Sequence, residues 1–165
     1  MTSNTASPQH DASKIGFLLF VVLGAIGALT PLAIDMYLPA MPAIARDLGA
    51  SAGAVQITLT AYTAGFAIGQ LLHGPLADSY GRRPVMLCGV FLFAVASMVS
   101  ATTNGIDALT TVRAAQGFAG AAAAVVIQAV VRDMCDREDF ARAMSFVTLV
   151  VTWAPLVAPM IGGHL

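Results

Sequence analysis

The sequence predicts an all-α integral membrane protein. Three observations support this prediction: 58% of the 165 residues are hydrophobic, only 10% are charged, and the mean hydropathy is +0.80. A soluble domain carries about 25% charged residues. The hydrophobic residues also form runs of about twenty, the length that a helix needs to cross the hydrocarbon core. Because the alternating pattern of a membrane barrel is absent, we expect a helix bundle.

Five hydrophobic runs are long enough to be transmembrane helices. They cover residues 15–38, 54–76, 84–100, 106–131 and 140–162. The first run exceeds the apolar region of a cleaved signal peptide, roughly 7–15 residues, and this favours an uncleaved span. Residues 1–14 are polar, and we expect them to form a disordered tail.

The charges in the loops predict how the chain is oriented. If the five spans alternate, Arg46 lies alone on one side of the membrane. The opposite side then holds six basic residues: Lys14, Arg82, Arg83, Arg132, Arg137 and Arg142. Because basic residues gather in cytoplasmic loops, we expect a cytoplasmic N-terminus. The external segments are then 39–53, with a short surface helix, and a tight turn at 101–105, whereas 133–139 is an internal polar loop.

The charge balance and the motifs exclude several function classes. A net charge of -1 argues against a basic nucleic-acid-binding domain. Cys88 and Cys135 do not form a disulfide framework. We find no zinc-ligand spacing, no catalytic triad pattern and no glycine-rich phosphate loop. We therefore expect no metal site, no enzymatic activity and no ATP-driven pump.

Small residues mark one face of the second span. Ala61, Gly65 and Gly69 are four apart and share a helix face, and Gly117 and Gly120 repeat the pattern in the fourth span. Close backbone approach stabilises helix pairs in lipid. The pattern predicts either plain helix packing or a sliding surface between helices that move, and the sequence does not separate the two.

The segment 74–84 predicts a turn between the second and third spans. Gly81 allows a backbone turn that a side chain would oppose, and Pro84 suits the first turn of a helix. Asp78 is spaced to pair with Arg82 or Arg83. Considered alone, the segment fits an ordinary turn with cytoplasmic arginines.

The pattern Gly74-x-x-x-Asp78-x-x-Gly81-Arg82-Arg83 resembles the signature loop of the major facilitator superfamily. It departs from that loop at Ser79, where the family often has a basic residue. The resemblance implies the N-terminal part of a transporter with two six-helix halves and an internal 3+3 repeat. It also implies a latch that holds the cytoplasmic side closed, formed by these five residues.

Three further segments extend the resemblance to most of the chain after residue 15. Residues 31–42, around Asp35, are similar to the first span of the bicyclomycin-resistance (Bcr/CflA) branch. Arg113, Gln116 and Gly117 are similar to the family's fourth-span motif. The end of the fifth span resembles the antiporter motif of drug exporters, with Ala158 in a usual glycine position; its residues are Pro155, Pro159, Gly162 and Gly163. The resemblance implies a drug:proton antiporter of the bacterial inner membrane, energised by the proton gradient without a bound cofactor.

Two charged residues within the spans are candidates for the transport site. Arg113 lies seven residues into the fourth span, ~10 Å deep, where an unpartnered charge is unfavourable. Asp35 is the acidic residue of the first span and lies near its end. We expect Asp35 to carry the proton or contact the substrate, with Arg113 and Gln116 beside it. An arginine that extends to the interface and a carboxylate that ends the helix are the alternatives. Tyr37, Tyr62, Gln70 and Gln128 either line a cavity or pack within the bundle.

Five spans are one short of a six-helix half. We therefore expect either a fragment of a longer transporter or a truncated product that does not transport. An uptake carrier or an amino-acid exporter is a further alternative. For the transporter reading, the expected partners are a drug-like small molecule, protons, the lipid bilayer and the missing C-terminal half. The chemical class of the substrate does not follow from the sequence.

Overall fold

The computed structural model describes the backbone of residues 9–162 and the side chains of residues 18–136 and 139–153. These residues form seven helices joined by short turns, without a strand in the described part. The helices are α1 (Gln9–Gly27), α2 (Leu29–Asp35), α3 (Tyr37–Asp47), α4 (Ala52–Tyr80), α5 (Arg82–Thr102), α6 (Ile106–Met134) and α7 (Arg137–Gly162). The predicted all-α membrane fold is confirmed.

Helices α1, α2 and α3 follow one another as a nearly continuous rod. Ala28 and Met36, the two residues between them, both keep a right-handed helical backbone. The helical path therefore extends from Gln9 to Asp47, beyond both ends of the expected span 15–38. The surface helix expected within 39–53 is present as α3, but it continues the first span, and only four residues then precede α4. Residues 9–14 of the expected tail belong to α1, and residues 1–8 lie outside the described part.

Two expected loops are shorter than the sequence analysis predicted. Helix α4 continues to Tyr80, so that Gly81 alone separates it from α5, and the segment 74–84 is largely helical. Gly81 has φ +92°, a conformation that glycine adopts freely, and Pro84 lies in the first turn of α5; both predictions are confirmed. The expected polar loop 133–139 is wrong, since only Cys135 and Asp136 lie between α6 and α7. The charged residues of this segment lie at the ends of helices, where charged side chains are readily accommodated.

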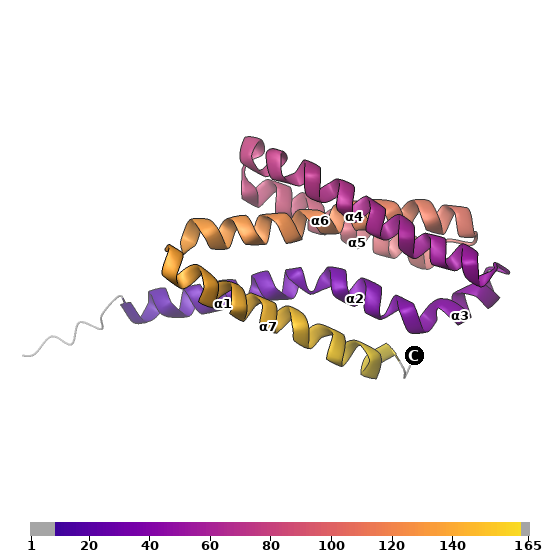
Figure 1. The fold of residues 1–165 in the computed structure, drawn as a ribbon, viewed down its shortest axis with the longest axis horizontal. Coiled ribbons are helices and arrows are strands. Elements are labelled where there is room, and N and C mark those ends of the chain that lie inside the picture. The colour runs from indigo at the N-terminus through magenta and orange to yellow at the C-terminus, as the bar shows by residue number, and fades with distance from the viewer. Residues whose placement is uncertain (1–8, 163–165) are drawn as a thin grey trace, which may run out of the picture.

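The helices form two groups joined by α6 (Figure 1). One group is α4, α5 and α6, and the other is the rod α1–α3 with α7 beside it. Helix α6 contacts helices of both groups, and it buries one long face, from Leu109 to Val131. A side chain on that face therefore lies at the centre of the bundle.

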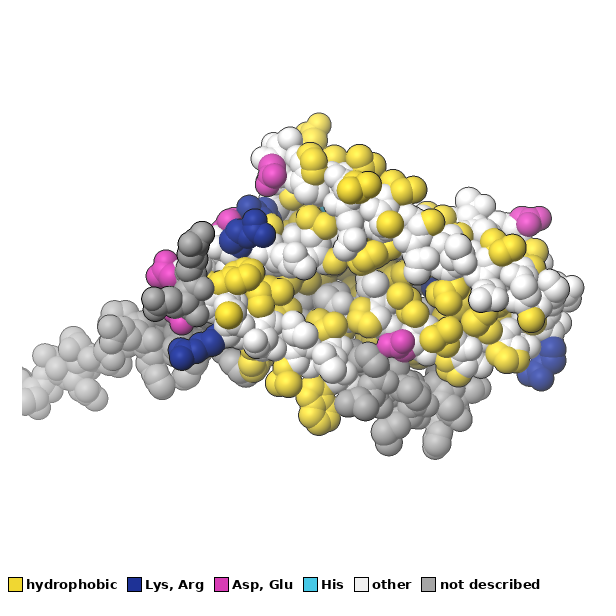
Figure 2. Space-filling view, in the orientation of Figure 1, with side chains coloured by type: hydrophobic (Ala, Val, Ile, Leu, Met, Phe, Trp, Pro, Cys, Tyr) yellow, Lys and Arg dark blue, Asp and Glu magenta, His cyan; other side chains and the backbone are white. Residues whose placement is uncertain are grey.

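Within the part of the chain whose side chains the structure describes, four segments are long and apolar enough to cross a membrane: 18–35, 52–80, 82–102 and 106–134. The fifth expected span lies within α7, where the side chains from residue 154 onward are outside the described part. Large apolar side chains such as Leu71, Phe91 and Met98 point outward. Figure 2 shows the charged side chains gathered mainly toward the two ends of the bundle, with apolar side chains between them. This distribution fits a hydrocarbon layer around the middle of the bundle.

Candidate functional site

The centre of the bundle is built on a close crossing of α4 and α6. A Cβ atom added to Gly117 would lie 2.0 Å from the Tyr62 carbonyl oxygen, and one added to Gly65 would lie 2.1 Å from that of Ala114. Gly69 faces Phe118 at a similarly short distance. The glycine faces predicted from the sequence are thus helix-packing surfaces, where two backbones touch. This crossing fixes the positions of the residues next to Gly117 on α6 and next to Tyr62 on α4.

Arg113 lies on the buried face of α6 and is only 4% exposed. Its Nη1 donates to Gln116 Oε1 at 2.8 Å, and its Nη2 donates to the backbone carbonyl of Ala33 at 3.3 Å. The guanidinium carbon also lies 4.1 Å from the ring centroid of Tyr37 and 4.6 Å from that of Tyr62. Carbonyl, amide and aromatic groups therefore surround the positive charge, and cation–π contacts add to the hydrogen bonds.

The hydrogen bonds continue from Arg113 across α5. Gln116 Nε2 donates to Ser97 Oγ at 2.8 Å, and Ser97 in turn donates to the Phe93 carbonyl at 2.7 Å. Tyr37 and Thr58 share a hydroxyl hydrogen bond that ties α3 to α4. We call Arg113, Gln116, Ser97 and Tyr37 the arginine network. Its residues lie on α3, α5 and α6, and their contacts with Ala33 and Thr58 also tie in α2 and α4, inside an apolar bundle.

Asp35 is near this network but is not bound to it in this structure. It is the last residue of α2 and is half-buried. Arg113 binds the carbonyl of Ala33, two residues earlier on the same helix. Among the side chains that the structure describes, no carboxylate lies within 4.0 Å of the Arg113 guanidinium. The expected direct Asp35–Arg113 contact is therefore absent here, while Arg113 and Gln116 are together as expected.

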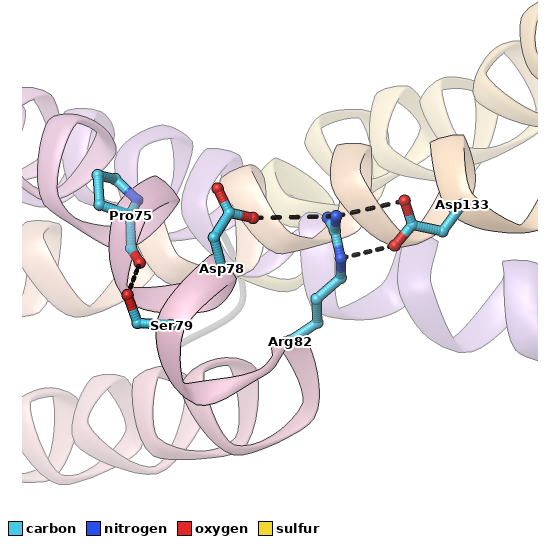
Figure 3. Close-up of polar contacts among 5 residues, drawn as sticks. All are labelled: Pro75, Asp78, Ser79, Arg82 and Asp133. Carbon is cyan, nitrogen blue, oxygen red and sulfur yellow. Dashed lines mark hydrogen bonds and ion pairs between the residues drawn. The ribbon is translucent and has the colours of Figure 1, made fainter.

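A second polar cluster lies at the α4–α5 end of the bundle (Figure 3). Arg82 Nε lies 2.7 Å from Asp133 Oδ2, and its Nη2 lies 3.2 Å from Asp133 Oδ1. Asp78 lies on the other side of Arg82 at 4.0 Å, as the sequence predicted. Arg83 is exposed, and a Cβ at Gly74 would meet nothing within 4 Å. The cluster thus binds α5 to the end of α6 through Arg82.

Sequence reasoning missed several partners and left others open. Ser97 and the Ala33 carbonyl were not predicted, because a serine in an apolar span and a backbone atom give little signal. Asp133 was assigned to a loop. Tyr62 is fully buried and Tyr37 lines a cavity, whereas Gln70 is exposed. Gln128 lines a smaller cavity of about 230 Å³ beside Arg82.

The residues of the expected antiporter motif cannot be placed in the same way. Pro155, Pro159 and Gly162 belong to the backbone of α7, but their side chains lie outside the described residues. Gly163 lies outside the described part altogether. Their role stays a prediction from the sequence.

A bundle of membrane-spanning helices that buries an arginine on a polar network has the design of a membrane transport protein, in which intramembrane charges mark transport pathways. The model of the Major Facilitator Superfamily matches residues 17–165, and the chain belongs to this superfamily. It is therefore part of a transporter family and not of an enzyme family.

Curated relatives cover most of the chain. It is 43% identical to a bicyclomycin resistance protein homolog of Haemophilus influenzae, over 94% of this chain and 39% of the relative. It is 44% identical to the uncharacterized MFS-type transporter YdgK of Bacillus subtilis, over 94% of this chain and 39% of the relative. It is 36% identical to multidrug resistance protein D of Escherichia coli, over 90% of this chain and 37% of the relative. The chain thus spans about two fifths of the length of these relatives.

Proposed function

We propose that this chain is the N-terminal part of a proton-coupled exporter of drug-like small molecules in the bacterial inner membrane. The observation that carries the proposal is the arginine network: a buried guanidinium held by neutral groups, with a half-buried carboxylate on the adjoining helix. The names of the relatives, bicyclomycin and multidrug resistance proteins, support the substrate class. The proton gradient supplies the energy, and no bound cofactor is required.

Asp35 is the proposed proton or substrate carboxylate. An uncompensated charge within the membrane favours a counter-charge nearby, so an ionised Asp35 is drawn toward Arg113. A protonated Asp35 carries no charge and is therefore not drawn toward Arg113. Because Arg113 already binds the α2 backbone at Ala33, a change of charge at Asp35 acts on the helix contact next to it. Gln116 and Ser97 hold the guanidinium in place while this change occurs.

The cluster around Arg82 is the proposed latch on the cytoplasmic side. Gly81 makes the tight turn that places Arg82 between Asp78 and Asp133. Arg83 contributes an exposed charge at this end, and Gly74 contributes an open helix face. Both are available to a packing partner. We propose that the C-terminal half of the transporter is that partner. The gathering of basic side chains at this end supports the further proposal that the N-terminus lies in the cytoplasm.

The test uses the complete gene product that contains this chain, expressed in a bacterium that lacks its own drug exporters. Export driven by an imposed proton gradient is measured with fluorescent cationic dyes and with chloramphenicol. We expect proton-driven export by the wild type and at least a tenfold loss in Asp35→Asn. The matched control is Asp107→Asn, an exposed aspartate in the first turn of α6, and it should export normally. Unchanged proton-driven export by Asp35→Asn would refute the proposed role of this carboxylate.

A further inference from the structure

A cavity of about 390 Å³, lined by both polar and apolar side chains, lies between α3, α5 and α6, on one side of the arginine network. Its lining includes Tyr37, Asp47, Ser97, Ser100, Arg113 and Gln116. Ser100 is near the end of α5 and Asp47 is the last residue of α3, so the cavity is at the end of the bundle opposite Arg82. Asp47 is exposed and Arg113 is buried. The cavity therefore extends from the surface of the bundle to its central charge.

Two buried polar atoms belong to residues of this wall and lack a partner. Arg113 Nε and Ser100 Oγ have no hydrogen-bond partner among the atoms that the structure describes. A buried donor without a partner is destabilising by about 1–3 kcal/mol, and more when it is charged. With less than 1 Å² of accessible surface each, the two atoms lie just behind the cavity wall, and a side-chain movement is needed before ordered water in the cavity can satisfy them. One water occupies about 30 Å³ in the liquid, so the volume here is ample.

The opposite face of α5 has a different character. Leu92, Val95 and Val99 line an apolar groove of about 400 Å³ against α6. Val99 and Ser100 are thus neighbours in sequence, at the same height along α5, but line different surfaces. Met98 and Ser97 form a second such pair two residues deeper along α5, with Met98 among the exposed apolar side chains. This contrast between a partly polar and an apolar face favours water on the Ser97 and Ser100 side of α5.

We propose that this cavity is a water-filled chamber that is open at the Asp47 end and hydrates the Arg113 guanidinium. It gives the solution on that side access to the arginine network without any separation of α4 and α6. In the exporter proposed above, protons from that solution enter through the chamber. This last part rests on the proposed function, whereas the hydration of the chamber does not.

The experiment places single cysteines in the complete gene product after Cys88→Ala, Cys135→Ala and removal of any other cysteine. Ser100→Cys and Ser97→Cys probe the chamber, and Val99→Cys and Met98→Cys are their matched controls. The reagent is a membrane-impermeant, positively charged methanethiosulfonate, applied to right-side-out or inside-out membrane vesicles. We expect Ser100→Cys to react at least tenfold faster than Val99→Cys, and only in right-side-out vesicles. Ser97→Cys should exceed Met98→Cys in the same way.

Proton-driven export is then measured in the same vesicles after labelling. The charged adduct on Ser100→Cys should reduce export at least fivefold, and a reductant that removes the adduct should restore it. Equal labelling of chamber and control positions would overturn the chamber. Labelling only in inside-out vesicles would overturn the proposed orientation, and with it the entry of protons from the external solution. Full export by the labelled Ser100→Cys protein would overturn the proton route. If the wild type shows no proton-driven export, the proposed function fails, but the labelling rates still decide whether the chamber exists.

Discussion

Arg113 and Arg82 are the same side chain in two opposite settings. Arg82 is at the end of the bundle, is partly exposed, and lies between two carboxylates. Arg113 is in the middle of the bundle, is 4% exposed, and is held by an amide oxygen, a backbone carbonyl and two aromatic rings. Among the side chains that the structure describes, Arg82 is paired with carboxylates, whereas Arg113 contacts only uncharged polar and aromatic groups.

The difference indicates what each arginine is suited to do. An ion pair near water contributes little free energy and breaks readily, which suits a latch. A buried charge without a counter-charge responds strongly to any charge that approaches it, since the surrounding dielectric is low. Arg113 is therefore suited to sense the ionisation of a nearby group, and Asp35 is the candidate. The following predictions test this comparison, from the largest expected effect to the smallest.

The largest effect should come from the helix crossing that holds Arg113. In Gly117→Ala the new methyl group would lie 2.0 Å from the Tyr62 carbonyl oxygen, so α4 and α6 must separate. Such overpacking destabilises by about 1–3 kcal/mol or more. We expect a lower melting temperature of the detergent-solubilised protein. Gly53→Ala is the matched control, because its Cβ would meet only Ser51 Oγ at 3.9 Å, an ordinary contact, and alanine favours the helix. Equal melting temperatures of the two variants would contradict the tight crossing.

A smaller effect is expected when Arg113 loses its amide partner. Gln116→Met removes the acceptor at Nη1 and leaves Ser97 without its donor. Hydrogen bonds to charged groups contribute about 1.5–3 kcal/mol. The melting temperature should fall, and the fall should be the same at low and high salt, because the network is buried. A decrease that disappears in high salt would contradict the burial of the network.

At the other arginine the effect should be smaller and salt-dependent. Asp133→Asn removes the charge 2.7 Å from Arg82, in a pair whose side chains are both partly exposed. Exposed pairs contribute about 0.2–1 kcal/mol, and salt screens them. We expect a small loss of stability at low ionic strength that vanishes in high salt. A large, salt-independent loss would make Arg82 resemble Arg113 and remove the contrast.

The smallest effect should be that of Asp78→Asn on stability. Its carboxylate lies 4.0 Å from Arg82 and is mostly exposed. We expect a change below about 0.5 kcal/mol in melting experiments. If the latch proposal is correct, the same variant should nevertheless alter transport by the complete protein, because its proposed partner lies in the other half. Normal transport by Asp78→Asn would count against the latch.

Much of the fold was predictable because hydrophobic length and glycine spacing are local properties. The small-residue faces at Gly65, Gly69 and Gly117 were predicted, although not that α4 and α6 pack against each other through them, and the turn followed from Gly81. The helix ends were less predictable. The segments 39–53, 74–84 and 133–139 were predicted as loops or turns, although charged and polar side chains are compatible with helix ends that project from the membrane.

The site was predictable only in part. Arg113 and Gln116 share a helix three residues apart, so their contact follows from helix geometry. Ser97, the Ala33 carbonyl and the Arg82–Asp133 pair depend on how separate helices pack, which spacing along one helix does not reveal. The direct pairing of Asp35 with Arg113 was expected from similar depth, but depth does not fix which way each helix turns its side chains.

The most direct test of this account is proton-driven export by Arg113→Met in the complete gene product, compared with Arg82→Lys. Methionine has a similar length to the stem of arginine and removes the buried charge, whereas lysine keeps a charge at the exposed latch. We predict that Arg113→Met is folded and inserted but exports at least tenfold more slowly than the wild type, while Arg82→Lys stays within threefold. Wild-type export by Arg113→Met would contradict the central claim that its buried charge couples protons to transport.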